Sequence, residues 1–366
     1  MKKVLKCILP VAILATMFFM VGCGGDDAAG DATVRIALVT DYGTIDDGSF
    51  NQGSWEGVLM FAQANNLPSD AYWFHQPVEI SDAAYLDSIE QVIVMGRADI
   101  VVTPGFLFSA AIYQAQDLFP DTKFVLLDAA PNPGGGGAVR IENNVVSVMY
   151  AEEQSGFLAG YAAVMDGYRS LGFVGGIPVP AVVRFGHGFV QGAEHAAQSL
   201  GLAPGAVTIN YHYAGTFSPQ PEIQTLAASW YAGGVELIFA AAGGAGFSVI
   251  AAAEANDGFV IGVDRDQAGD SDRVITSALK SLQGSVNSVI ADFVNDSFPG
   301  GQQVIFDASG DGVGLPMATS RFNQFTQAQY NAVFAQLVSG AVRVDARHDI
   351  AVTELNTPLV SVTLIG

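Results

Sequence analysis

Basic residues are scarce in this chain. Its 366 residues include 15 Lys and Arg against 36 Asp and Glu, which gives a formal net charge of -21. Nucleic-acid binding depends on Lys and Arg that neutralise phosphates. The balance therefore argues strongly against a nucleic-acid partner, and also against ligands that carry several phosphates. A neutral or cationic ligand is easier to accommodate on so acidic a surface.

Cysteine is scarcer still, with Cys7 and Cys23 alone. An apolar run over residues 7–21 follows three lysines at the start of the chain, which is the order of an export signal. The run is shorter than the ~20 residues that a membrane-spanning helix needs. We therefore expect residues 1–22 to form a signal peptide and the protein to reside in the cell envelope, outside the cytoplasm.

The end of this run, Met20-Val21-Gly22-Cys23, resembles the lipobox of bacterial lipoproteins, with Met20 where the pattern usually has Leu. The resemblance implies cleavage before Cys23 and a lipid anchor on its sulfur. An ordinary signal peptide with an incidental cysteine is the alternative. Cys7 would leave with the signal, so neither a disulfide framework nor thiol chemistry is expected. Residues 23–33 are small and acidic, as in a flexible tether.

Strand-length apolar runs alternate with helical segments along the rest of the chain. This alternation predicts an α/β fold with doubly wound parallel sheets, and the length is too great for one core, which indicates two lobes. The predicted strands are residues 36–40, 100–103, 124–127, 170–174, 237–240, 259–263 and 274–277. The predicted helices are residues 109–118, 152–165, 189–200, 246–255, 286–294 and 326–337, and residues 350–365 have a strand-like pattern.

The first predicted strand runs into a polar loop over residues 41–48. This loop and the start of the next helix carry Asp41, Asp46, Asp47, Ser49 and Asn51. Ser49 with Gln52 fits a capping box, which predicts a helix that begins at Ser49. Ligands of open parallel α/β sheets sit beyond the carboxyl ends of the strands. We therefore interpret the loop as one wall of a small-molecule site.

Polar residues follow other predicted strands as well. Asp128 and Asp264 come directly after apolar runs, as Asp41 does. A single Asp in this place is about as often a helix cap or turn former as a ligand-binding residue. Three of them together favour a shared crevice. Lys280 is a further candidate for this site, because it is one of only two lysines beyond the signal. The alternative is that it is a solvated surface lysine.

Two loops are further candidates for ligand contact. Gly243 opens a Gly-Gly-Ala-Gly loop whose backbone N–H groups could approach a ligand closely, although it has neither the lysine of a P-loop nor the dinucleotide spacing. Phe217 is a loop aromatic that could stack on a flat ring, or could face the core instead. The five histidines show no metal-ligand spacing and no nucleophile partner. No catalytic residue, metal or cofactor is therefore expected.

Five stretches in the same order resemble the basic membrane protein family, namely residues 41–56, 144–163, 172–192, 240–246 and 262–267. These proteins are the substrate-binding lipoproteins of ABC importers, and known members resemble a purine nucleoside receptor. The match runs over about residues 35–281. It implies a type I periplasmic-binding-protein fold whose two lobes are joined by three crossovers. Lobe 1 would hold residues 34–150 and 267–305, and lobe 2 residues 151–266 and 306–366.

The resemblance also implies a role for individual residues. Asn51 and Asp128 would bind the edge of the base, and Phe217 would stack on its face. Asp264 and Lys280 would bind the ribose hydroxyls, with the Gly243 backbone alongside and Asp41 in the wall of the first lobe. Purine-binding members can carry an aromatic residue where this chain has Ile45, which leaves the preferred base open.

The same resemblance implies a binding protein rather than an enzyme. Asp41, Asn51 and Asp128 would come from the first lobe, Phe217, Gly243 and Asp264 from the second, and Lys280 after the chain crosses back. A nucleoside that contacts both sets would shift the population toward a closed form. Permease and ATPase subunits would be the partners of this lipid-anchored protein, which we expect to be a monomer.

Two alternatives remain at this point. Residues 40–47 resemble the calcium-binding cluster of nucleoside hydrolases, but Val39 replaces the first Asp of that cluster and one residue is inserted before the Asp pair. Calcium needs six to eight oxygen ligands, which this stretch is poorly placed to supply. The other alternative is a sensor that uses the same fold for a sugar or another small neutral solute.

Overall fold

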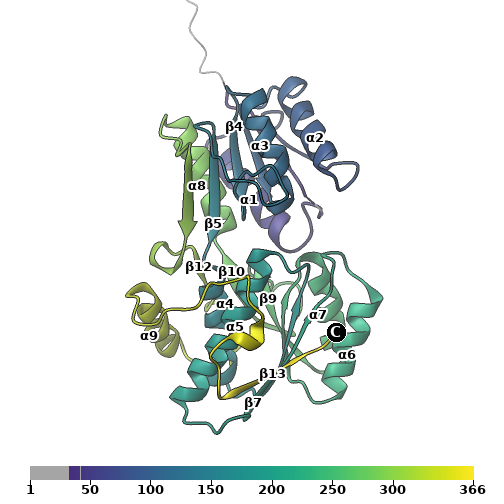
Figure 1. Ribbon diagram of the computed structural model, residues 1–366, viewed down its shortest axis with the longest axis vertical. Coiled ribbons are helices and arrows are strands. Elements are labelled where there is room, and N and C mark those ends of the chain that lie inside the picture. Colours follow the sequence, from purple (N-terminus) through teal and green to yellow (C-terminus); the bar gives the residue numbers. More distant parts are fainter. Residues whose placement is uncertain (1–32, 42) are drawn as a thin grey trace, which may run out of the picture. The chain divides into compact units, whose positions relative to one another are not determined.

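The computed structural model describes residues 33–41 and 43–366 (Figure 1). The expected signal peptide, the lipidation site Cys23 and residues 24–32 of the expected tether lie outside the described residues. Residues Val34–Gly366 form one compact unit. In the described part of the chain, no helix combines the length and the apolar character that crossing a membrane requires.

The first sheet has the strand order β11-β5-β4-β3-β1-β2, with every neighbouring pair parallel. Its strands are β1 (Ile36–Val39), β2 (Tyr72–His75), β3 (Ile100–Pro104), β4 (Lys123–Leu127), β5 (Val145–Tyr150) and β11 (Gln302–Phe306). Helices α1 (Phe50–Ala64) and α8 (Leu282–Val294) cover one face, and α2 (Asp82–Val94) and α3 (Ser109–Leu118) cover the other. Ile36 and Leu38 face the side covered by α1 and α8, and Ala37 and Val39 face the side covered by α2 and α3. Because both faces of the sheet are buried, β1 is apolar at every position.

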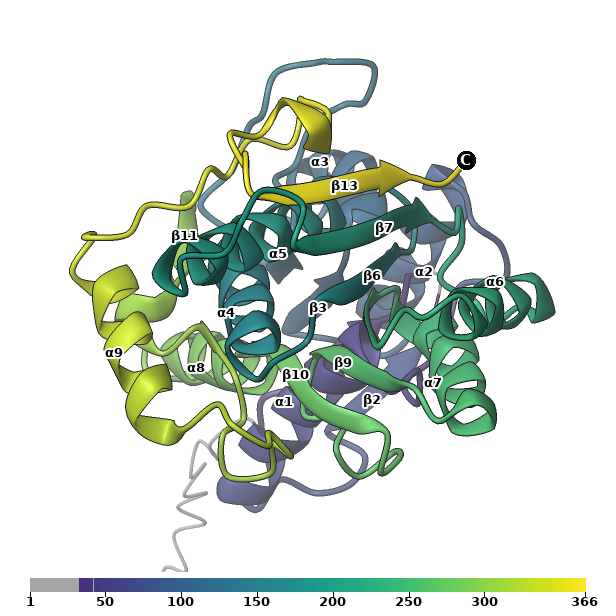
Figure 2. The same ribbon diagram turned by 90° about the horizontal axis from the view of Figure 1, so that it is seen from below.

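The second sheet has the order β12-β10-β9-β8-β6-β7-β13, and only its β10–β12 pair is antiparallel. Its strands are β6 (Ser170–Gly175), β7 (Val207–Tyr213), β8 (Leu237–Ala241), β9 (Phe259–Asp264), β10 (Val274–Lys280), β12 (Val313–Gly314) and β13 (Val360–Leu364). Helices α4 (Glu152–Met165) and α5 (Pro180–Ser199) pack together on one face, and α6 (Pro221–Ala232) and α7 (Gly246–Asn256) on the other. Figure 2 shows β13, β7 and β6 side by side, with α9 (Gln327–Val338) beyond α4.

The chain passes between the two sheets three times: after β5, after β10 and after β11. The expected return to the first lobe at residue 267 is wrong, because β10 pairs with β9 in the second sheet. The second lobe therefore continues through Lys280, and the first resumes at Ser281. Lys280 thus belongs to the second lobe, not to a segment that has already crossed back. The first and third crossings are tied together, since Ala151 N donates to Phe306 O over 3.1 Å.

Helices α4 and α5 touch at their backbones. A Cβ atom on Gly156, Gly160, Gly188 or Gly192 would lie within 2.1 Å of a carbonyl oxygen on the facing helix. Nothing larger than a hydrogen atom fits at these positions. The two helices form a glycine seam that fixes their spacing.

Most predicted elements are present, but several have different bounds; α8, for example, begins at Leu282 and not at residue 286. The predicted helices 109–118 and 152–165 coincide with α3 and α4, and all seven predicted strands are present. The predicted helix 189–200 is wrong at its start, because α5 begins at Pro180, a residue suited to the first turn. The strand-like pattern of residues 350–365 yields only β13.

Candidate functional site

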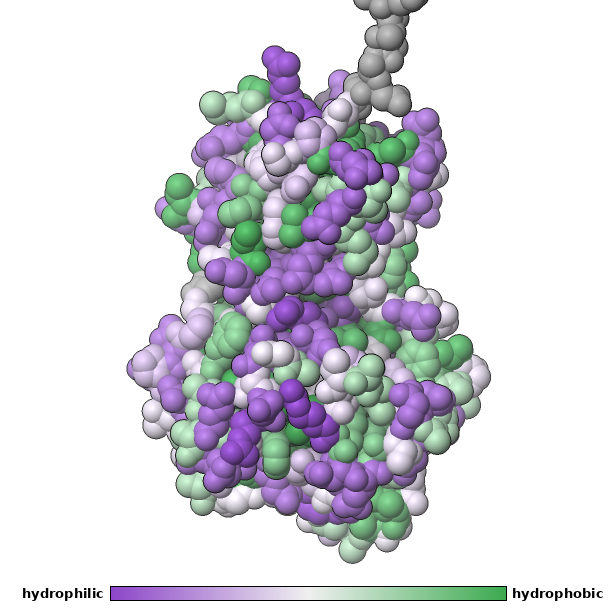
Figure 3. All heavy atoms as spheres, turned by 180° about the vertical axis from the view of Figure 1, so that it is seen from behind, coloured by the Kyte–Doolittle hydropathy of each residue, from purple (hydrophilic) through white to green (hydrophobic). Residues whose placement is uncertain are grey.

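One cavity lies where the carboxyl ends of strands from both sheets meet. All seven candidate residues line it: Asp41, Asn51, Asp128, Phe217, Gly243, Asp264 and Lys280. The space inside, including its mouth, is about 750 Å³, which is within the usual range of small-molecule sites. On the face shown in Figure 3, hydrophilic residues gather at the junction of the two lobes, and hydrophobic ones are scattered elsewhere.

Asp47 holds the start of α1. Its Oδ1 accepts from the backbone N–H groups of Ser49 (2.9 Å) and Gln52 (3.0 Å), and its Oδ2 accepts from the backbone N–H of Asn51 (3.0 Å). The predicted capping box is therefore wrong, because the side chain of Ser49 accepts no cap hydrogen bond. One carboxylate binds three amides at the helix start, and this leaves the Ser49 hydroxyl free to donate to Asp264 Oδ2 over 2.5 Å.

The amide of Asn51 is oriented by two carboxylates. Its Nδ2 donates to Asp41 Oδ1 (2.9 Å) and to Asp47 Oδ2 (3.0 Å), which uses both of its hydrogens. Its Oδ1 accepts a long bond from Asp41 N (3.4 Å). What Asn51 still offers toward the cavity is acceptor capacity on Oδ1.

Gly176 leaves room for the ring of Phe217. A Cβ on Gly176 would lie 2.3 Å from this ring, and Gly243 approaches the Phe217 side chain with a φ of +55°. Phe217 O accepts from Ala245 N over 2.8 Å. The loop is therefore tied to the turn that opens α7, and its aromatic ring forms part of the cavity wall.

Three charged side chains at strand ends converge from the two lobes. Lys280 Nζ forms an ion pair with Asp128 of the first lobe and lies 3.9 Å from Asp264 Oδ1 of the second. Both aspartates have a left-handed backbone, with φ values of 61° and 68°, a region that Asp tolerates better than most residues. Among the described residues, Asp128 Oδ1 has no hydrogen-bond partner.

Behind Lys280 lies a buried pair that sequence reasoning missed. Glu152 Oε1 is 3.3 Å from Lys280 Nζ, and Glu152 Oε2 accepts from Arg184 Nε over 2.6 Å. These residues lie 32 positions apart, so no local pattern could link them. Both lie within stretches that carry the family resemblance, residues 144–163 and 172–192, and this was their only available signal.

Burial and crowding shift the ionisation of this cluster. Burial raises the pKa of Asp128 to about 7, with Lys280 opposing the shift and Glu152 adding to it. Burial alone would lower the pKa of Lys280, but Asp128, Glu152 and Asp264 outweigh it and raise that pKa. Burial would likewise raise the pKa of Glu152, but Lys280 and Arg184 lower it. The cavity therefore keeps a charged ammonium next to a carboxylate that titrates near neutrality.

Acceptors outnumber donors among the side chains that line the cavity. Four carboxylates and one amide oxygen face a single ammonium group, so the site suits a ligand that donates several hydrogen bonds through O–H and N–H groups. Apolar contact comes from Phe50, Phe106, Phe185 and Phe217. In the described part of the chain, no cluster of three or more His, Cys, Asp or Glu side chains could hold a metal ion.

The positions of Ile45 and Phe106 relative to the cavity could not be predicted from the sequence. Ile45 packs against the hydrophobic core and does not line the cavity. Phe106, in the turn after β3, does line it. Asp47, in the loop interpreted as one wall of a small-molecule site, lines the cavity as well, although it was not among the seven candidate residues.

A cavity at the strand ends of two doubly wound lobes, with three crossovers between them, defines a binding protein with the type I periplasmic-binding-protein fold. The family follows from the sequence match. Residues 34–347 match the model of the PnrA-like ABC transporter substrate-binding proteins, and the chain belongs to this family. It is an ABC transporter substrate-binding protein, a class that acts outside the cytoplasm.

Known relatives and solved structures agree with this placement. The chain is 31% identical over 348 residues to the ABC transporter nucleoside-binding protein BmpA of Lactococcus lactis, covering 87% of this chain and 93% of that protein. It is 28% identical over 293 residues to basic membrane protein B of Borreliella burgdorferi, covering 78% and 81%. A solute-binding protein of an ABC transporter from Aeropyrum pernix K1 shares the fold, with a TM-score of 0.73 and 21% identity over 86% of this chain and 95% of that one.

Proposed function

We propose that the protein captures a nucleoside between its lobes and presents it to the permease of an ABC transporter. One observation carries the proposal: the seven residues implicated by family resemblance come from distant parts of the chain, and all line a single cavity. The name of the Lactococcus lactis relative, a nucleoside-binding protein, points in the same direction.

The donors and acceptors of the cavity suit a sugar-linked base. Hydroxyl groups of a ribose would donate to Asp264 and accept from Lys280. N–H groups on the base would donate to Asp128 Oδ1 and Asn51 Oδ1, the acceptors with spare capacity. Stacking on Phe217 would contribute ~1–3 kcal/mol. We propose a purine as the base, because Phe50 and Phe106 extend the apolar lining beside Phe217.

The nucleoside leaves unchanged in this proposal, so the protein is not an enzyme. Incubation with inosine and calcium tests this directly, with chromatography to detect free base. We expect none above a protein-free control, and release of base would overturn the non-enzymatic role.

We further propose that the mature protein is a monomer anchored through lipid on Cys23. Radiolabelled fatty acid incorporated in the bacterial host should appear in the protein and be absent from a Cys23→Ala variant. Light scattering in detergent tests the monomer. Label that persists without Cys23 would contradict the anchor.

The decisive experiment is a calorimetric screen of ligands. Purine nucleosides, pyrimidine nucleosides, free bases and ribose should be titrated separately, with thermal shifts as a second readout, because a ligand that binds only the folded form raises its melting temperature. We expect binding by purine nucleosides and little by ribose or bases alone. Preferential binding of a free sugar would replace the nucleoside with a sugar ligand.

A further inference from the structure

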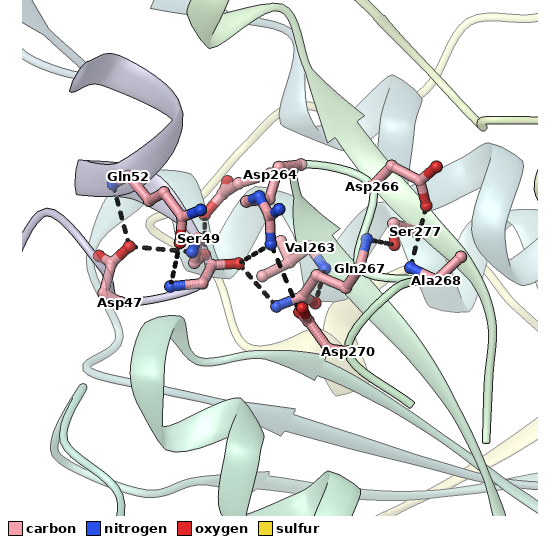
Figure 4. Close-up of polar contacts among 12 residues, drawn as sticks. Asp47, Ser49, Gln52, Val263, Asp264, Asp266, Gln267, Ala268, Asp270 and Ser277 are labelled. Atoms are coloured by element: carbon pink, nitrogen blue, oxygen red, sulfur yellow. Dashed lines mark hydrogen bonds and ion pairs between the residues drawn. The ribbon is translucent and has the colours of Figure 1, made fainter. Parts of the chain in front are cut away.

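Next to the cavity, the loop before α1 is held by the second lobe (Figure 4). The carbonyl oxygen of Gly48 accepts from Gln267 Nε2 over 2.9 Å and from Arg265 Nη1 over 3.4 Å. Gly48 belongs to the first lobe, and the other two residues belong to the second. The described residues that line the cavity include none of these three. These contacts therefore do not involve whatever occupies it.

The amide of Gln267 has one possible orientation. Its Oε1 accepts from Val263 N over 2.9 Å, and its own backbone N–H donates to Ser277 Oγ over 3.0 Å. A flipped amide would place N–H against N–H at Val263 and oxygen against oxygen at Gly48. The side chain is 3% exposed. Gln267 is thus a buried, fixed donor aimed at the opposite lobe.

An apolar contact accompanies this hydrogen bond. Gly48 has a φ of +69°, and a Cβ there would lie 2.4 Å from the ring of Phe247 on α7. Phe247 is 36% exposed, so its remaining area is covered in part by the opposing loop. We call the contacts of Gly48 with Gln267, Arg265 and Phe247 the Gly48 clasp.

The clasp fixes a loop that carries cavity residues. Gly48 stands between Asp47, which orients the amide of Asn51, and Ser49, whose hydroxyl bonds to Asp264. If the clasp opens, the first-lobe wall of the cavity loses part of its support from the second lobe, and the hydrogen bond from Ser49 to Asp264 remains. The effect reaches the ligand through Asp47 and Asn51, not through a contact of its own.

We propose that Gln267 is a positioning residue that determines ligand affinity without touching the ligand, by stabilising the conformation in which the lobes enclose the cavity. The identity of the ligand rests on the nucleoside function proposed above. A ligand that needs this conformation binds with an affinity reduced in proportion to the fraction of molecules that adopt it. Loss of one hydrogen bond should therefore weaken every ligand by the same factor, about threefold to tenfold.

The variant Gln267→Glu isolates the clasp. It keeps the oxygen that accepts from Val263 N but places a second oxygen against the Gly48 carbonyl. Phe247→Ala removes the apolar half and leaves Gln267 untouched. The matched control is Gln114→Glu, the same change at an exposed side chain whose Nε2 donates to Ala110 O within α3. All proteins would carry Val78→Cys and Leu200→Cys, exposed positions on the two lobes, for fluorescent labels.

Single-molecule energy transfer at pH 8 without ligand should show a larger open population in Gln267→Glu and Phe247→Ala than in wild type or Gln114→Glu. With adenosine, guanosine and inosine, dissociation should quicken by a common factor. An unchanged open population would overturn the proposal, as would factors that differ among the nucleosides, since these indicate direct contact. If wild type binds no nucleoside, the proposed function fails, and the ligand-free measurement alone decides on the clasp.

Discussion

Arg184 donates a hydrogen bond from Nε to Glu152 Oε2 over 2.6 Å, and the two side chains are almost wholly buried. Through its other oxygen, Glu152 lies 3.3 Å from the ammonium of Lys280. This carboxylate therefore connects the cavity to the seam between α4 and α5. A buried charge pair with one partner removed leaves the other uncompensated, so the pair matters for folding as well as for the shape of the site.

Glu152→Gln should lower the free energy of unfolding by about 3–5 kcal/mol, because it removes the negative charge between two buried cations. Urea denaturation followed by circular dichroism measures this. Asp257→Asn serves as the control, since that carboxylate is largely exposed in its pair with Arg273 and exposed pairs add little. Equal stability of the two variants would show that Glu152 is dispensable.

Asp264→Asn should weaken nucleoside binding several-fold while it changes the melting temperature of the protein little. The amide keeps the shape and tolerates the left-handed backbone, but it accepts hydrogen bonds less strongly from a ribose hydroxyl and from Ser49. Because burial raises the pKa of Asp264, loss of its charge is not costly to folding. Calorimetry that finds wild-type affinity would remove Asp264 from the binding site.

Stability should depend on pH through Asp128. Its pKa is 3.8 for an ordinary Asp and about 7 in the folded protein. Between these values the folded state binds more protons than the unfolded state, so this group makes the protein less stable as pH rises from about 4 to about 7. The free energy of unfolding of wild type should fall across this window relative to Asp128→Asn, which cannot titrate.

Urea titrations at pH 5, 6 and 7.5 measure this difference. Asp121→Asn, at an exposed position, is the control and should follow wild type. A difference between wild type and Asp128→Asn that stays constant with pH would show that Asp128 does not titrate there.

The glycine seam should not tolerate a methyl group. In Gly192→Ala the new Cβ would lie 1.9 Å from the carbonyl oxygen of Phe157, and such overpacking typically costs about 1–3 kcal/mol. Gly310→Ala is the matched change at a position with no neighbour within 4 Å and should leave the melting temperature close to that of wild type. Thermal denaturation that finds no difference would mean the helices can separate freely.

The fold was largely predictable because its strands are buried on both faces. Runs such as residues 36–40 are apolar at every position, and this makes them visible without any alternation. The start of α5 could not be predicted, because Gly186 and Gly188 lower the helix propensity of this segment and interrupt its apolar pattern. The position of β10 was also beyond reach, because a strand's apolar character does not say which of two sheets it joins.

The candidate site was predictable where a polar residue follows a strand, as Asp128 and Asp264 do. Its supporting residues were not. Glu152 and Arg184 meet only through tertiary packing, and Gln267 gains its role from contact with Gly48, 219 positions away. The N-terminal cap of α1 is a further example. The sequence predicted Ser49 as the capping residue, but the carboxylate of Asp47, two residues earlier, accepts the hydrogen bonds from the first amides of the helix.

Lys280 is the last residue of β10, and the second crossing begins at the next residue. When two bodies rotate about an axis, each atom is displaced in proportion to its distance from that axis. The ion pair between Lys280 and Asp128 therefore lies beside a crossing, and a rotation of the lobes about the crossings would stretch it less than contacts at the outer rim. During such a rotation the ion pair would keep the two lobes attracted to each other while a ligand enters or leaves the cavity.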